Sequence, residues 1–312
     1  MKNLFQNFFL FMVFIEFILG ILGNGFLGLI NCIHWVKSSK ISLSDFIIMN
    51  LAFSRIILQC VISLDGVVLV FYPSIYVSET FIQIREIGWT LSNYLSIWLV
   101  TCLSVFYCLK IAIFSHPAFL WLKWRVSQVI AQILLFSVLF SFFNILSLIR
   151  KFNMYSDFLK MTNIVNCTEI SRRKEMEYYS THILGLLWTV IPFIISLISY
   201  FLLILSLKRH TRMLQHHITV PRDMSSEAHV KATKTMFYFL LLFVFYLVIM
   251  YIGSSSFFLT DTTLTIMIVE LVAPLYPSVH SFMLILQNKN LKQEFLRLLW
   301  LKKGCIKGGV TS

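Results

Sequence analysis

Charged residues are scarce in this chain, and their scarcity sets its class. Only 13% of the 312 residues are Asp, Glu, Lys or Arg, whereas a soluble domain carries about 25%. Hydrophobic residues make up 58% of the chain, and the mean hydropathy is +0.81. A soluble chain this apolar would aggregate. The composition therefore excludes an ordinary soluble domain and indicates a membrane protein.

Motifs for disulfides, metals and catalysis are also missing. Cys167 is the only cysteine in a loop that we expect outside the membrane, so an extracellular intrachain disulfide has no second partner. Most other cysteines lie in apolar stretches, where a thiol behaves as a small hydrophobe. There is no CxxC, GxSxG or HExxH motif, so we expect no metal site, no cofactor and no enzymatic activity.

Seven long apolar stretches are present, and each has the roughly 20 residues that a membrane-spanning helix needs. The chain is therefore expected to be an all-α membrane protein with a seven-helix bundle at residues 1–286 and a cytoplasmic tail at 287–312. The first stretch is too long for a cleaved signal peptide. The predicted spans are Phe8–Val36, Leu43–Phe71, Ile87–Phe114, Val126–Ile149, Ile183–Leu207, Thr235–Leu259 and Leu264–Leu286.

The basic residues predict how the bundle is oriented. About two thirds of the Lys and Arg residues fall on one side, in the segments after spans 1, 3 and 5 and in the tail, and such an excess marks the cytoplasmic side. The N-terminus is then extracellular and the C-terminus cytoplasmic, in the plasma membrane. The net charge of +12 is explained by this asymmetry, so we do not expect nucleic-acid binding.

Two further features agree with this orientation. Asn166-Cys167-Thr168 is an N-glycosylation sequon in a loop predicted to be outside. After the last span, Leu291, Phe295, Leu298 and Leu299 fall on one helix face, which predicts a short amphipathic helix on lipid at the inner membrane surface. Cys305 follows Lys302-Lys303 and is either palmitoylated or an unmodified thiol.

Arg55 is the least expected residue in a predicted span. It lies about 18 Å from the inner end of span 2, and Asn24 in span 1 lies at the same depth. A guanidinium has five donors and no acceptor, so we expect partners among side-chain oxygens and among carbonyls freed near Pro277. The predicted polar group is either a movable hinge or a static staple between spans 1, 2 and 7. Its members are Asn24, Arg55, Ser278, His280 and Ser281.

At this point the sequence resembles a known family over nearly its whole length. "GNGF" and "NLAFSR" are similar to signatures in the first two spans of the type 2 taste receptors, which are the bitter receptors among the G protein-coupled receptors. "LSIWLVTCLSVFYCLKIAIFSHPAFLWLKWR", "PFIISLISYFLLILSLKRHTRM", "EAHVKATKTM" and "PSVHSFMLILQNKNLKQ" resemble later segments in the same order. The resemblance implies a receptor for bitter small molecules that activates a gustducin-type heterotrimeric G protein.

The chain departs from the family pattern at two positions. Met224 follows Asp223 where the family usually has proline, and Ile113 replaces the asparagine of an Ala-Asn-Phe-Ser segment. Neither change involves a charged group, so we expect tuning of function. The Asp-Arg-Tyr and Asn-Pro-x-x-Tyr motifs of rhodopsin-like receptors are missing, which leaves Arg55 and His280-Ser281 as candidate substitutes.

The resemblance also suggests where ligands bind. Trp89 and Asn93 share a helix face near the outer end of span 3, Glu270 lies in the outer half of span 7, and Tyr246 lies deeper in span 6. Such a mostly apolar site with a few polar groups suits amphipathic organic molecules. Three of these residues also have a structural alternative. Trp89 could anchor the interface, Asn93 could bond a neighbouring helix, and Glu270 could pair with a basic loop residue.

Candidate contacts with the G protein lie at the predicted inner ends of spans 3, 5 and 6. Positive-inside anchoring alone would explain most of these basic residues, so His116-Pro117 and His210 are the preferred candidates. The full set is Lys110, His116, Pro117, Lys123, Arg125, His210, His229 and Lys231.

Three other functions agree less well with the sequence. A transporter or channel would favour internal repeats with broken helices at matching positions, and Pro192, Pro274 and Pro277 show no such pairing. An intramembrane enzyme would need a catalytic set at one depth. A vomeronasal type 1 pheromone receptor is the nearest rival within the receptors.

Overall fold

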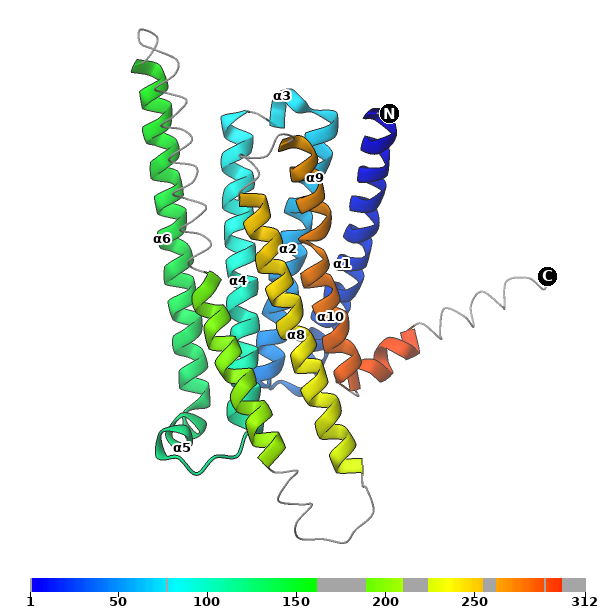
Figure 1. Cartoon of the computed structure of the whole chain (residues 1–312), viewed down its shortest axis with the longest axis vertical. Helices are drawn as coiled ribbons and strands as arrows, with labels where there is room; N and C mark the ends of the chain where they lie inside the picture. The colour runs from blue at the N-terminus through cyan, green and yellow to red at the C-terminus, as the bar shows by residue number, and fades with distance from the viewer. Residues whose placement is uncertain are drawn as a thin grey trace, which may run out of the picture.

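The structure is a computed structural model, and it describes residues 2–76, 78–161, 189–209, 224–254, 262–288 and 290–298. These residues form long helices that run side by side through most of the molecule (Figure 1). The helices are α1 (Lys2–Ser38), α2 (Leu43–Phe71), α3 (Pro73–Tyr76), α4 (Glu79–Ile111), α5 (Pro117–Trp124), α6 (Val126–Met161), the helix Thr189–Arg209, α8 (Met224–Ser254), α9 (Thr262–Val272), α10 (Leu275–Gln287) and residues 290–298.

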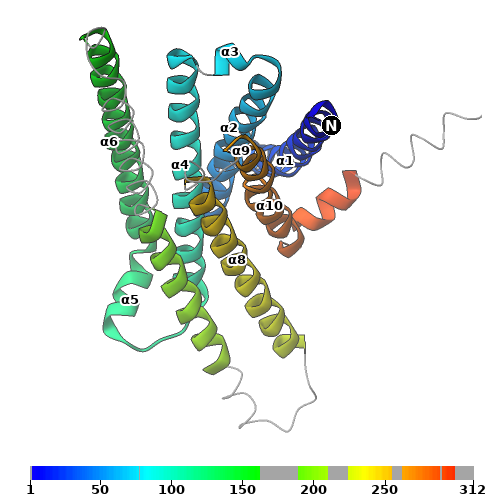
Figure 2. The same ribbon diagram turned by 45° about the horizontal axis from the view of Figure 1, so that its top comes forward.

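The all-α, seven-span architecture expected from the sequence is confirmed. Six helices of the described residues are long and apolar enough to cross a membrane, and α8 adds a shorter apolar stretch, Phe237–Gly253. The α3 segment and the N-terminus lie at one end of the bundle, and α5 lies at the other (Figures 1 and 2). We call these the α3 end and the α5 end.

Helix capping explains where α4 and the short helix α5 begin. The helix α4 begins at Glu79 rather than Ile87 because Ser78 caps it, with Ser78 Oγ accepting a hydrogen bond from the Phe81 backbone N–H at 3.4 Å. The short helix α5 was not predicted. Pro117 is its first residue, and His116 Nδ1 accepts from the Ala118 backbone N–H at 3.3 Å, so local chemistry defines where α5 begins.

The seventh predicted span is two helices joined at residues 273–274. Proline has no backbone N–H and breaks the hydrogen-bond ladder inside a helix. The helix α10 begins immediately after Pro274, so Pro277 falls in its first turn, where an N–H would have no partner in the helix anyway. The break therefore removes the conflict between two prolines and one continuous helix.

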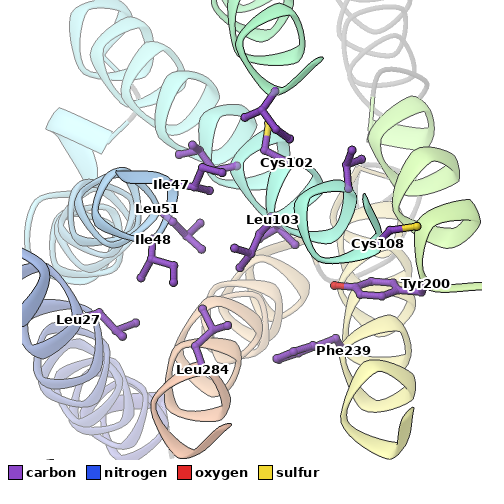
Figure 3. Packing of buried hydrophobic residues seen from close by; sticks show 14 of the residues in the cluster. Leu27, Ile47, Ile48, Leu51, Cys102, Leu103, Cys108, Tyr200, Phe239 and Leu284 are labelled. Atoms are coloured by element: carbon purple, nitrogen blue, oxygen red, sulfur yellow. The ribbon is translucent and has the colours of Figure 1, made fainter. Parts of the chain in front are cut away.

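The largest apolar core lies toward the α5 end and connects α1, α2, α4, α10 and the helix Thr189–Arg209 (Figure 3). Leu27, Leu51, Leu103 and Leu284 are all buried within it. Many other large apolar side chains, such as those of Phe14 and Leu135, are exposed on the bundle surface. Because lipid tails are as apolar as leucine, close packing rather than water exclusion distinguishes the core from this surface.

Close contacts join α1 both to α2 and to the helix 290–298. Gly20 lies against Gln59, since a Cβ at this glycine would be only 2.9 Å from the Gln59 side chain. In the helix 290–298, Phe295 packs edge-on against Phe26 with ring centroids 5.0 Å apart, and it also contacts Phe282 at 6.4 Å. The helix after the last span is thus packed on the bundle through its apolar side.

Candidate functional site

Arg55 lies at the centre of a buried polar network in the middle of the bundle. The side chain is only 1% exposed. Its Nε donates to Ser96 Oγ on α4 at 3.2 Å, and its Nη1 donates to Ser281 Oγ on α10 at 2.7 Å. Nη1 also lies 3.2 Å from His280 Nδ1. Since a guanidinium only donates, the His280 ring accepts this hydrogen bond through Nδ1.

Ser281 extends the network to α1. Its hydroxyl lies 2.6 Å from Asn24 Oδ1 and 2.9 Å from the Pro277 carbonyl oxygen. The amide of Asn24 in turn donates to the Gly20 carbonyl at 2.9 Å. Four helices, α1, α2, α4 and α10, therefore meet at one polar group. The depth argument from the sequence predicted the joining of spans 1, 2 and 7.

Two details of this group differ from the sequence expectation. Arg55 reaches Asn24 through Ser281, and its described partners are side chains rather than freed backbone carbonyls. Ser278 is buried, but its hydroxyl has no hydrogen-bond partner in the described part of the chain. Ser96, which the sequence argument missed, is a direct partner of Arg55.

Aromatic rings connect the polar network to α8. Tyr276 stacks on Tyr246 with centroids 4.8 Å apart and on Phe243 at 5.7 Å. The guanidinium carbon of Arg55 lies 6.0 Å from the centroid of the same Tyr276 ring. His280 packs against Phe239 at 4.3 Å. Tyr276 and Phe239 were not singled out from the sequence, although Tyr276 lies four residues before His280, as neighbours on one helix face do.

Asn93 and Tyr246 form a direct link between α4 and α8. The Tyr246 hydroxyl donates to Asn93 Oδ1 at 2.6 Å, and both residues are buried. Trp89 is partly exposed one turn earlier on α4, and its carbonyl accepts from the Ser92 hydroxyl at 3.3 Å. Two of the four predicted ligand-binding residues are thus in contact, with the third on the same helix.

Glu270 lies in different surroundings, between α9, α1 and α2. Its Oε2 would be 3.4 Å from a Cβ at Gly66, and Phe9 borders the same glycine. The carboxyl groups of Glu270 and Asp65 are neighbours. Asp65 also accepts from Arg85 at 3.3 Å, and Arg85 bonds Glu86 at 3.0 Å. The described contacts of Glu270 therefore belong to a charged cluster at the α3 end.

Tyr76 of α3 covers this charged cluster. The Arg85 guanidinium lies 5.2 Å from the Tyr76 ring centroid. Burial, followed by the nearby Asp65 carboxylate, raises the pKa of the Tyr76 phenol. The phenol therefore stays protonated near neutral pH and remains a hydrogen-bond donor at the α3 end of the bundle.

A third polar group joins α4 to the helix Thr189–Arg209. Thr101 Oγ1 donates to the Pro192 carbonyl at 3.2 Å, and the Ser196 hydroxyl donates to Thr101 Oγ1 at 3.0 Å. Thr101 and Ser196 are completely buried. The sequence argument missed this group, because threonine and serine in an apolar span usually bond their own helix and give no signal of a cross-helix contact.

At the α5 end, the residues predicted to contact a G protein have unequal surroundings. Lys123 Nζ donates to the Ala112 carbonyl at 3.1 Å, which caps the end of α4. Lys110 lies 5.9 Å from the Phe106 ring, and Arg125 lies 5.0 Å from the Trp121 ring. His116 and Pro117 begin α5 and are exposed. Lys123 thus has a structural task in addition to any role with a partner.

Several predicted residues fall outside the description. Asn166 and His210, together with Cys167 and Cys305, lie outside the described residues. His229 and Lys231 lie in the backbone of α8, but their side chains are not among those described.

Comparisons with known proteins cover almost all of the chain. A family profile described as "Taste receptor protein (TAS2R)" matches residues 1–303. The chain is 47% identical to "Taste receptor type 2 member 3" of Pongo pygmaeus over 307 residues, or 98% of each chain. It is 46% identical to the Homo sapiens member 3 over 309 residues, covering 99% of this chain and 98% of the relative.

A second group of relatives gives the same result. The chain is 44% identical to "Taste receptor type 2 member 7" of Pan troglodytes over 311 residues, covering 99% of this chain and 97% of the relative. The matches run through the spans that contain Arg55, Asn93, Tyr246 and the α10 serines. The chain therefore belongs to the taste receptor type 2 family and is a multi-pass bitter taste receptor of the G protein-coupled class.

Proposed function

We propose that this receptor detects bitter small molecules in a pocket between the helices near the α3 end and activates a gustducin-type G protein at the α5 end. One observation carries the proposal. The Asn93–Tyr246 hydrogen bond is connected by the Tyr246–Tyr276 stack to the Arg55 group. A ligand that displaces this hydrogen bond would move α8 against α4 and disturb the contacts of Arg55.

The proposed ligand contacts have separate roles. Asn93 and Tyr246 offer an amide and a phenol that can exchange their mutual hydrogen bond for one with the ligand. Trp89, partly exposed on α4, offers an apolar ring face. Glu270 on α9 would attract a basic group on the ligand from the α1–α2 side. An agonist can shift the receptor only by the difference in its affinity for the two states.

The Arg55 group is the proposed conformational switch. Asn24, Ser281 and His280 hold α1 and α10 to the guanidinium, while Ser96 holds α4 to it. Ser278 lies three residues before Ser281, and its hydroxyl is unused among the described residues, so it offers Arg55 or Asn24 an alternative partner after α10 shifts. Because the same atoms serve both arrangements, the switch needs no new residues.

The proposed G protein surface is formed by the α4–α5 segment and the inner ends of the fifth and sixth spans. His116 and Pro117 are exposed at the start of α5. Lys110, Lys123 and Arg125 surround this segment with positive charge. His210, His229 and Lys231 complete the proposed set from the sequence alone. This positive charge would steer an acidic surface of the G protein toward the inner end of the bundle.

We further propose that the α3 end is extracellular, with the N-terminus outside, the C-terminus cytoplasmic and the receptor in the plasma membrane. The asymmetry of Lys and Arg supports this orientation, and Asn166 is then a glycosylation site. Asn166→Gln should remove a glycan-sized shift on a gel, and glycosidase treatment should remove the same shift from the unmodified chain. A band that neither treatment changes would reject glycosylation at Asn166.

The function is tested by intracellular calcium in cells that express the chain with a gustducin-like chimeric G protein. A panel of bitter compounds should give dose-dependent signals that are missing in mock-transfected cells. Surface staining in the same cells measures delivery to the plasma membrane. Silence to the whole panel despite strong surface staining would argue against bitter agonists and favour another ligand class, such as pheromone-like molecules.

A further inference from the structure

Arg55 is a positively charged side chain in the bundle interior, and no ion pair with a carboxylate is found for it in the described part of the chain. The ion pairs found among the described residues are Arg85–Asp65, Arg85–Glu86 and Arg297–Glu294. The partners of Arg55 are two hydroxyls and the neutral acceptor nitrogen of His280. A charged side chain at the centre of a bilayer is costly unless it is compensated. The polar partners reduce this cost, but none of them supplies the missing negative charge.

Arg55 and its neighbour Tyr276 each have an unused hydrogen-bonding group among the described residues. Arg55 Nη2 is buried and has no hydrogen-bond partner in the described part of the chain, and the same is true of the Tyr276 hydroxyl. Both residues are at most 4% exposed. The Tyr276 ring centroid lies 6.0 Å from the guanidinium carbon of Arg55. Buried donors in folded proteins nearly always have partners.

These two observations specify the missing partner. A buried water molecule would accept hydrogen bonds but would leave the charge uncompensated, whereas an anion does both. The available donors suit a small monovalent ion. A sulfate or phosphate group carries more charge and more acceptor atoms than one guanidinium nitrogen and one phenol can satisfy. We propose that the receptor binds one chloride ion between α2 and α10, held by Arg55 Nη2 and the Tyr276 hydroxyl.

This ion would stabilise the arrangement of helices that the structure shows. Tyr276 lies between Arg55 and Tyr246, so a chloride at this position ties the Arg55 group to the aromatic stack. Any movement of α10 that separates Tyr276 from Arg55 weakens the site. Chloride is therefore expected to bind this arrangement more tightly than one in which α10 has shifted.

The test is thermal unfolding of the purified full-length receptor in detergent, without agonist. The buried thiols of Cys102 and Cys108 become available to a thiol-reactive fluorophore on unfolding. Sodium chloride is titrated against sodium gluconate at constant ionic strength. A ligand that binds only the folded state raises the unfolding temperature by mass action, and we expect a rise of about 3 °C at a tenfold excess over the dissociation constant. Bromide should act like chloride.

Three variants separate this site from general salt effects. Arg55→Gln should unfold at the same temperature in chloride and gluconate. Arg297→Gln removes an exposed arginine in the helix 290–298 and should keep the chloride effect. Tyr276→Phe keeps the ring that stacks on Tyr246, and it should raise the chloride concentration for half of the effect about tenfold, since one hydrogen bond to a charged group is lost.

The overturning results are specific. Equal unfolding temperatures of the unmodified receptor in chloride and gluconate would reject the ion, as would a chloride effect of normal size in Arg55→Gln. If Arg55→Gln does not fold, Tyr276→Phe decides the question: an unchanged midpoint would reject the site, and a shifted midpoint with Arg297→Gln unchanged would support it.

Discussion

The two ends of the bundle are built from different chemistry. Toward the α5 end, one continuous apolar cluster extends over α1, α2, α4, α5, α6, α8, α10 and the helices Thr189–Arg209 and 290–298. Toward the α3 end, the described residues form smaller apolar groups, one around Phe9 and Met267 and one around Phe243 and Tyr276. Between and beyond these groups lie Asn93, Glu270 and the Arg85 cluster.

This difference assigns separate tasks to the two ends. A continuous, close-packed cluster has one favoured arrangement, because any displacement opens voids that lose dispersion contacts. Polar pairs such as Asn93–Tyr246 can instead exchange partners, provided that the new partner also forms hydrogen bonds. The α5 end is therefore expected to move as a unit, while the α3 end adapts to ligands of different shape. Arg55 lies where the two kinds of packing meet.

The largest expected effect on signalling comes from removing the positive charge of Arg55, which lies between the two ends. Arg55→Leu leaves Ser96, His280 and Ser281 without their common donor and disconnects the aromatic stack from α1. We expect agonist-evoked calcium signals to fall at least about tenfold, because hydrogen bonds to a charged group contribute about 1.5–3 kcal/mol each. Arg297→Leu, which changes an exposed arginine, is the control. A full response at normal surface expression would mean that the Arg55 group is dispensable.

The second-largest effect is expected on stability, at the close-packed α5 end. Leu103 is 3% exposed in the main apolar cluster, and Leu103→Ala should lower the free energy of unfolding by about 2–5 kcal/mol through lost packing and a cavity. Thermal unfolding of the purified receptor measures it. Leu91→Ala, at a 42% exposed position on the same helix, should have little effect. Equal losses at both positions would erase the distinction between core and lipid-facing surface.

A smaller effect is expected at the adaptable end. Tyr246→Phe removes the hydroxyl that donates to Asn93 Oδ1 at 2.6 Å but keeps the ring stacked on Tyr276. The amide is left without its partner, at a cost of about 1–3 kcal/mol, so basal calcium signalling or agonist potency should change about tenfold. Tyr238→Phe, at an exposed position on α8, should behave like the unmodified receptor. If Tyr246→Phe and Asn93→Ala act additively when combined, the hydrogen bond is not the coupling element.

The smallest effect is expected at Glu270. Glu270→Gln keeps the shape of the side chain and removes its ability to be charged beside Asp65. Potency should change severalfold for agonists with a basic group and little for neutral ones, because only the former can pair with a carboxylate. Glu79→Gln, at an exposed position on α4, is the control. Identical dose curves for basic and neutral agonists would remove Glu270 from the pocket and leave it as part of the charged cluster.

The sequence predicted the seven-helix architecture and three of the helices around Arg55, because hydrophobic length and helix rise are properties of the linear chain. Ser96 was missed because a serine in an apolar span usually bonds its own helix and gives no signal of a contact with another helix. The partners of Glu270 could not be predicted, since its depth is readable from the sequence but the rotation of α9 is not. That rotation depends on the break before α10 and on the space that Gly66 leaves in α2.

The packing of Phe295 against Phe26 and Phe282 has a consequence for biosynthesis. Chains emerge from the ribosome with the N-terminus first, so α1 enters the membrane long before the residues that cover Phe26 have been made. The first helix completes its contacts only when the last described helix has left the ribosome. A receptor truncated before residue 290 would contain all seven spans, yet the Phe26 ring on α1 would lack its contact with Phe295. We expect the quality control of the cell to retain such a receptor as incompletely folded.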